Sequence, residues 1–186
     1  MNWLVFSILA YLFTALQLGL SPTLAIHSRF GPITPHFELA LLVLPGLFAP
    51  SRQTVLSWAV MGLILDLAIQ PYVGDATIIG PHALGYAAGG YVVLQLRTMV
   101  VRTHPLSWCF AAVAGGIAAM LVVTGILTFR GWYDPAMHIR PAAELAARML
   151  DVLYSAPFAL LFAWPLMKLS PALGLQLSKN ATRRGM

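Results

Sequence analysis

Two ionisable side chains, Asp66 and His82, lie within apolar stretches on either side of a turn that contains Pro71 and Gly74. If helices flank this turn, both side chains lie at a similar depth, about 8 Å from the helix ends at a rise of 1.5 Å per residue. A carboxylate that accepts a hydrogen bond from an imidazole satisfies both groups away from water. The spacing therefore predicts either a polar clasp between two helices or a site that handles a ligand or a proton.

The composition indicates that these side chains lie in a lipid bilayer. Apolar residues make up 59% of the 186 residues and charged residues only 9%, whereas about a quarter of a soluble domain is charged. Polar groups inside a membrane are the first place to look for function. Gln17, the one amide near the middle of the first apolar stretch, joins Asp66 and His82 as a candidate for the clasp or ligand site.

Six apolar stretches predict an all-α polytopic membrane protein, because about 20 apolar residues cross a bilayer as a helix. The second stretch is the shortest, and Pro35, Pro45 and Pro50 crowd or interrupt it. It is short enough to be re-entrant, but we favour a crossing because a bilayer thins around a short helix. We expect one transmembrane domain over residues 1–178 and a basic cytoplasmic tail over residues 179–186. The predicted spans are 2–26, 33–49, 54–69, 76–96, 108–129 and 152–169, the last with an amphipathic start at Pro141.

Glycines at helical spacing predict where these helices pack closely. Gly62 lies one turn before Asp66, and Gly85 and Gly89 lie one turn apart in the fourth span. Gly115 and Gly116 form a second small face in the fifth span. Small residues of this kind let helix backbones approach one another in a membrane. We therefore expect these five glycines to contact neighbouring helices.

The distribution of basic residues predicts the orientation. Cytoplasmic loops carry an excess of Lys and Arg. With six crossings, the side that holds both termini carries more bases than the other side, so both termini are predicted to be cytoplasmic. Loss of the second span would move the N-terminus outside. The richer side holds Arg52, Arg97, Arg102, Lys168, Lys179, Arg183 and Arg184, and the poorer side holds Arg29, Arg130, Arg140 and Arg148.

Several chemistries are disfavoured by the sequence. The single cysteine, Cys109, excludes an intramolecular disulfide and a cysteine-based metal cluster. Paired-histidine metal motifs, a nucleophile elbow and a phosphate-binding loop are all missing from the sequence. The basic tail suits anionic lipid rather than nucleic acid. We therefore expect no catalytic set, cofactor or metal.

The segment 58–67, followed by Gly74 and the segment 80–86, is similar to the signature of the rod shape-determining protein MreD family. The segments 35–38 and 154–158 also resemble that family. The resemblance implies a non-enzymatic component of the bacterial cell-wall elongation machinery in the cytoplasmic membrane. It implies binding to an MreC-like protein and work beside a RodA-type glycosyltransferase and a class B penicillin-binding protein.

The same family is similar in architecture to the six-helix substrate-binding subunits of energy-coupling-factor vitamin transporters. A transport subunit that binds a small vitamin-like molecule is therefore the alternative hypothesis. A cavity lined by Gln17, Asp66 and His82 would suit such a ligand. A membrane enzyme is a distant third, because no nucleophile and base can be paired in the sequence.

Overall fold

Six helices and two short β-hairpins make up the computed structural model, which describes residues 1–28, 31–69, 72–73, 76–77, 79–101, 104–133 and 140–175. The predicted helical class is confirmed, and the hairpins are an addition to it. The predicted basic tail, 179–186, lies outside the described residues. The elements are α1 (Trp3–Leu20), β1 (Ile26–Ser28), β2 (Gly31–Ile33), α2 (Phe37–Phe48), α3 (Ser51–Ile69), β3 (Tyr72–Val73), β4 (Ala76–Thr77), α4 (Pro81–Leu96), α5 (Pro105–Gly131) and α6 (Pro141–Leu169).

Three predicted span limits are wrong, and in each case a hairpin takes the place of helix. The first span was predicted to reach residue 26, but α1 ends at Leu20, just before a proline that cannot continue it. The second span starts at Phe37 rather than residue 33, and the fourth at Pro81 rather than residue 76. β1 pairs with β2 and β3 with β4, both antiparallel. Proline at the first position of α4 suits a helix start, because its missing N–H has no partner there in any case.

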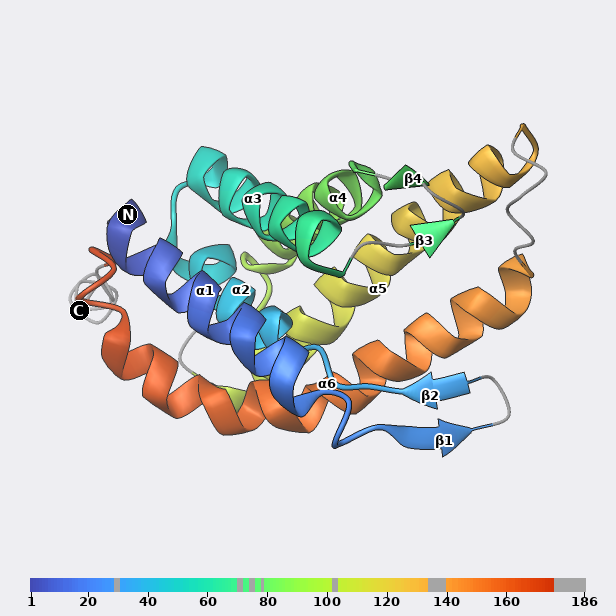
Figure 1. Cartoon of the computed structure of the whole chain (residues 1–186). Coiled ribbons are helices and arrows are strands. Elements are labelled where there is room, and N and C mark those ends of the chain that lie inside the picture. Colours follow the sequence, from blue (N-terminus) through green and yellow to red (C-terminus); the bar gives the residue numbers. More distant parts are fainter. Residues whose placement is uncertain are drawn as a thin grey trace, which may run out of the picture.

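Helix α2 lies at the centre of the bundle and packs against each of the other five helices. Eleven of its 12 residues are buried. The helix continues through Pro45, so the predicted interruption at this proline is wrong. Figure 1 shows both hairpins at one end of the bundle and the start of α1 at the other. The last described turn lies beside the start of α1, where Leu173 O accepts a hydrogen bond from Asn2 N at 2.8 Å.

Two of the predicted packing glycines, Gly89 and Gly115, surround a buried tryptophan together with Gly90. Trp58 of α3 is fully buried, and its Nε1 donates to the carbonyl oxygen of Leu42 in α2 at 2.9 Å. A Cβ added to Gly89, Gly90 or Gly115 would lie 2.5–2.8 Å from a neighbouring atom, with the indole of Trp58 among the atoms met at each. The indole therefore fills a space that exists because these three positions have no side chain.

The other predicted glycines also lie at helix contacts. A Cβ on Gly62 would collide with the backbone of His82 in α4, so α3 and α4 approach closely beside the predicted polar pair. A Cβ on Gly85 would lie 2.6 Å from Ala119 O in α5, and one on Gly116 would meet side chains of α2 and α6. Alanine at Gly62 or Gly85 would push two helices apart, because the atoms met there include backbone.

Three helices, α1, α5 and α6, are long and apolar enough to cross a membrane, and α2 is a shorter apolar helix. Large apolar side chains are exposed on α1 and α6, among them Leu4, Tyr11, Leu161 and Trp164. Exposed apolar rows on long helices are expected where the surroundings are lipid tails. The chain is therefore a helical membrane protein.

Candidate functional site

The predicted contact between Asp66 and His82 is present in the structure. The Asp66 carboxylate is fully buried near the end of α3, and its Oδ1 lies 2.7 Å from His82 Nδ1. The carboxylate also accepts hydrogen bonds from the backbone N–H groups of Gly80 (2.9 Å), His82 (3.2 Å) and Ala83 (3.1 Å). Because Gly80 precedes α4 and has no side chain to cap it, Asp66 caps α4 from the neighbouring helix.

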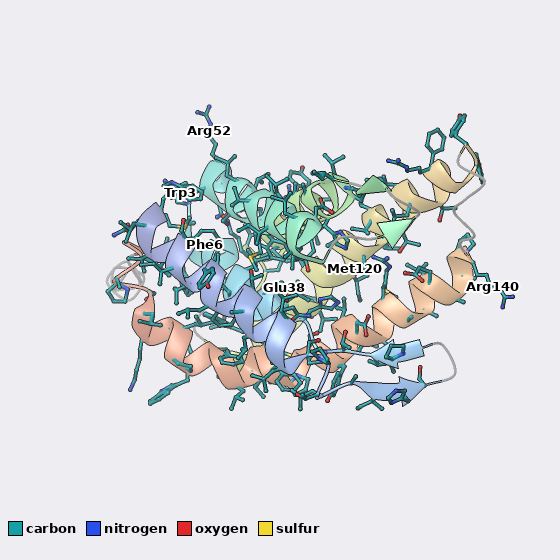
Figure 2. The ribbon with its side chains drawn as sticks, viewed as in Figure 1. Trp3, Phe6, Glu38, Arg52, Met120 and Arg140 are labelled. Carbon is teal, nitrogen blue, oxygen red and sulfur yellow. The ribbon has the colours of Figure 1, made fainter. Side chains whose placement is uncertain are left out.

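A second pair of the same kind, which sequence reasoning missed, lies at the start of α2. Glu38 is fully buried, and its Oε1 lies 2.7 Å from His36 Nδ1. The hydroxyl of Tyr86 in α4 donates to the same oxygen at 2.8 Å, so α2 and α4 are joined through a carboxylate. The other oxygen, Oε2, has no hydrogen-bond partner among the described residues. Figure 2 shows Glu38 in the interior of the molecule.

Gln17, the third candidate for the clasp or ligand site, faces protein and caps α2. It is buried, its Oε1 accepts from Phe37 N at 2.9 Å, and its Nε2 donates to Ser21 Oγ at 3.3 Å. Ser155 Oγ of α6 accepts from His36 N at 2.7 Å. The N-terminus of α2 is therefore capped by side chains from α1 and α6, since its own N-cap, His36, makes no side-chain cap.

A cavity of about 680 Å³ lies at the hairpin end of the bundle, where α1 ends and α2, α4 and α6 begin. Gln17 and His82 both line it, whereas Asp66 is not among its lining residues and lies behind His82. The structure thus brings two of the three predicted polar residues to one cavity. The third, Asp66, contacts His82 from behind the cavity wall. The lining residues are Gln17, Leu18, Ser21, Pro22, Ala25, His27, Gly31, Pro32, Thr34, His36, His82, Met120, Glu144, Ala147, Arg148 and Asp151.

The first turns of α6 supply the remaining charges of the cavity. Arg148 Nε and Nη2 donate to Glu144 Oε1 at 2.9 and 2.8 Å, which is the contact expected four residues apart on a helix. Asp151, three residues beyond Arg148, accepts instead from the backbone N–H of Thr34 at 2.7 Å. It therefore ties the segment between β2 and α2 to α6.

The cavity has the size and mixed lining of a small-molecule site, since such sites measure about 300–1,000 Å³ and hold a few polar groups in an apolar wall. Within the described residues, no group of three or more His, Cys, Asp or Glu is placed to hold a metal ion. Comparison with protein-family models, curated proteins and solved structures finds no match for the chain.

Proposed function

We propose that the chain is a membrane component of the bacterial cell-wall elongation machinery, of the MreD type. In this proposal it crosses the cytoplasmic membrane six times with both termini in the cytoplasm. It binds an MreC-like protein and helps to position a RodA-type glycosyltransferase and a class B penicillin-binding protein. It performs no bond-making step of its own.

The observation that supports this proposal is the convergence of the segments that resemble MreD. Segments 58–67 and 80–86 join through the Asp66–His82 contact, and Tyr86 of the second segment donates to Glu38 of segment 35–38. Segment 35–38 in turn joins segment 154–158, because His36 N donates to Ser155 Oγ. The four segments that resemble one family thus form one connected hydrogen-bond network, and this connection is what supports the proposal.

The packing also suits a positioning role. The helices approach closely through glycines, so the bundle resists deformation and transmits the placement of one bound partner to another. The exposed apolar rows of α1 and α6 offer surfaces on which a partner's transmembrane helix can lie in place of lipid.

The placement of basic residues supports the proposed orientation. Figure 2 shows Arg52 and Arg140 at opposite ends of the molecule. Arg97 lies at the same end as Arg52, since its Nη1 donates to Ala49 O at 2.8 Å, just after α2 ends. In the six-span arrangement this end faces the cytoplasm, and the hairpins and the cavity face outward.

The test is to purify the tagged full chain from solubilised native membranes and to identify the proteins that accompany it by mass spectrometry. Recovery of an MreC-like protein with wall-synthase components supports the proposal. Gly125→Ala, at a position where an added Cβ meets nothing within 4 Å, is purified in the same way as a control and should recover the same proteins. Recovery of neither an MreC-like protein nor a wall synthase would contradict the proposal.

The second candidate function is the substrate-binding subunit of a vitamin-type transporter, and the cavity of about 680 Å³ favours it. In the proposed orientation this cavity opens toward the side from which such a subunit collects its substrate. The same purification distinguishes the two functions, because a transport subunit would bring an ATPase pair and a coupling membrane protein with it.

A further inference from the structure

Two histidines that line the cavity, His36 and His82, are held in the same way. Each has its Nδ1 2.7 Å from an oxygen of a fully buried carboxylate, Glu38 or Asp66. An ionised carboxylate only accepts hydrogen bonds, so Nδ1 carries the proton in both rings. In the neutral rings, Nε2 is therefore a lone-pair acceptor. Each ring, when neutral, thus brings an acceptor rather than a donor to the same cavity.

The charges around the cavity are unbalanced. Four carboxyl groups line it or lie directly behind its histidines: Glu38, Asp66, Glu144 and Asp151. The arginine of the lining, Arg148, donates both of its described hydrogen bonds to Glu144. Asp151 receives a neutral backbone N–H, and Glu38 has one oxygen without a partner among the described residues. The wall therefore carries an excess of negative charge and of hydrogen-bond acceptors.

We propose that this cavity binds its ligand through a protonated primary amine. An ammonium group has one positive charge and three N–H donors, which complement the negative charge of this wall and the acceptors that Asp151 and neutral histidine rings place in it. An organic cation fits better than a metal ion, because the described residues place no three metal-ligating side chains together. The apolar part of the lining, which includes Leu18 and Met120, accommodates the ligand's carbon chain.

The ammonium group has two possible sources, a small soluble amine and the headgroup of an aminophospholipid. Both present the same chemistry at the hairpin end of the bundle, where lipid headgroups lie in the six-span arrangement. The inference does not depend on the role in cell-wall elongation, because the amine site stands on the cavity and its charges alone.

The direct test measures binding of three four-carbon probes of matched size to the full chain in a non-ionic detergent. The probes are n-butylammonium, n-butanol and butyrate, and the readouts are titration calorimetry and the shift of the thermal unfolding midpoint. We expect saturable binding and stabilisation with n-butylammonium alone. Absence of saturable n-butylammonium binding, or equal binding of butyrate, would overturn the proposal.

Two charge variants make the test independent of a loss of folding. Asp151→Asn removes a negative charge and keeps an oxygen for Thr34 N, so butylammonium should bind about tenfold more weakly. Arg148→Gln removes a competing positive charge and leaves Glu144 unpaired, so the same probe should bind about tenfold more tightly. The Arg148–Glu144 pair is partly exposed and contributes little to folding. Variants that shift the affinity in the same direction would refute the amine assignment.

The source of the amine is resolved by native mass spectrometry of the protein released from two bilayers. Retention of phosphatidylethanolamine but not of phosphatidylglycerol identifies a lipid headgroup as the ligand, and loss of that retention in Asp151→Asn locates the lipid in the cavity. Binding of soluble butylammonium without selective lipid retention identifies a free amine. Selective retention of phosphatidylglycerol would contradict the proposal, because that headgroup carries no amine.

Discussion

Replacing Asp66 by leucine removes the acceptor of four hydrogen bonds. Three come from the backbone N–H groups of Gly80, His82 and Ala83, and the fourth comes from the ring of His82. Asparagine has the same shape and keeps one oxygen. With that oxygen toward Gly80 N and Ala83 N, its amide donates to the His82 ring in the other tautomer, so only the His82 N–H loses its partner.

The two substitutions therefore differ in magnitude. An unsatisfied buried N–H costs about 1–3 kcal/mol, and these three N–H groups are partly buried, so the leucine variant should lose about 3–5 kcal/mol of unfolding free energy. The asparagine variant should lose about 1–2 kcal/mol. At about 2–4 °C per kcal/mol for a chain of this size, the unfolding midpoint should fall by at least about 6 °C for Asp66→Leu and by about 2–8 °C for Asp66→Asn.

The assay is the thermal unfolding midpoint of the purified full chain in detergent, together with its yield from membranes. Leu67→Ala is the matched control, because Leu67 is the neighbouring residue on α3 and is about half exposed. We expect the control to unfold close to the wild-type midpoint. Equal, wild-type midpoints and yields for Asp66→Asn and Asp66→Leu would refute the reasoning that Asp66 holds α3 and α4 together.

The same unfolding assay checks two further predictions. Gly115→Ala should lose about 1–3 kcal/mol, because its Cβ would lie 2.5 Å from the indole of Trp58. Gly125→Ala on the same helix meets nothing within 4 Å and should be neutral or stabilising, so equal midpoints for the two would contradict the close packing. Tyr86→Phe should lose about 1.5–3 kcal/mol, because the Glu38 carboxylate loses a buried donor at 2.8 Å, and an unchanged midpoint would show that this contact contributes nothing.

Features that depend on local composition were predictable from the sequence. The six helices follow from apolar length, and the packing glycines from their spacing within that length. The contact of Asp66 with His82 was predictable because both residues lie beside the same turn, but the predicted depth was wrong, since α3 ends at Ile69 and α4 begins at Pro81. The pairing of Glu144 with Arg148 follows from a spacing of four residues on one helix.

Features that depend on contacts between distant segments were not predictable. Glu38 lies in the first turn of a short helix, and its partner Tyr86 lies 48 residues away on α4. Nothing in the sequence indicated that α2 and α4 pack against each other. The caps of α2 from Gln17 and Ser155 are also long-range, because they need α1 and α6 to converge on one helix start. The sequence did contain one signal of the second pair, because Glu38 lies two residues after His36 at the beginning of the apolar stretch.

The enclosure of α2 has a consequence for how the protein is made. A 12-residue helix is about 18 Å long, well short of a hydrocarbon core of about 30 Å, so alone in lipid it would leave polar backbone and Glu38 in contact with acyl chains. Its partners Tyr86 and Ser155 leave the ribosome only after it does, and Ser155 belongs to α6, the last helix among the described residues. Biogenesis cannot therefore be completed one helix at a time. Until the sixth helix is in place, the start of the second helix lacks the Ser155 hydroxyl that caps it.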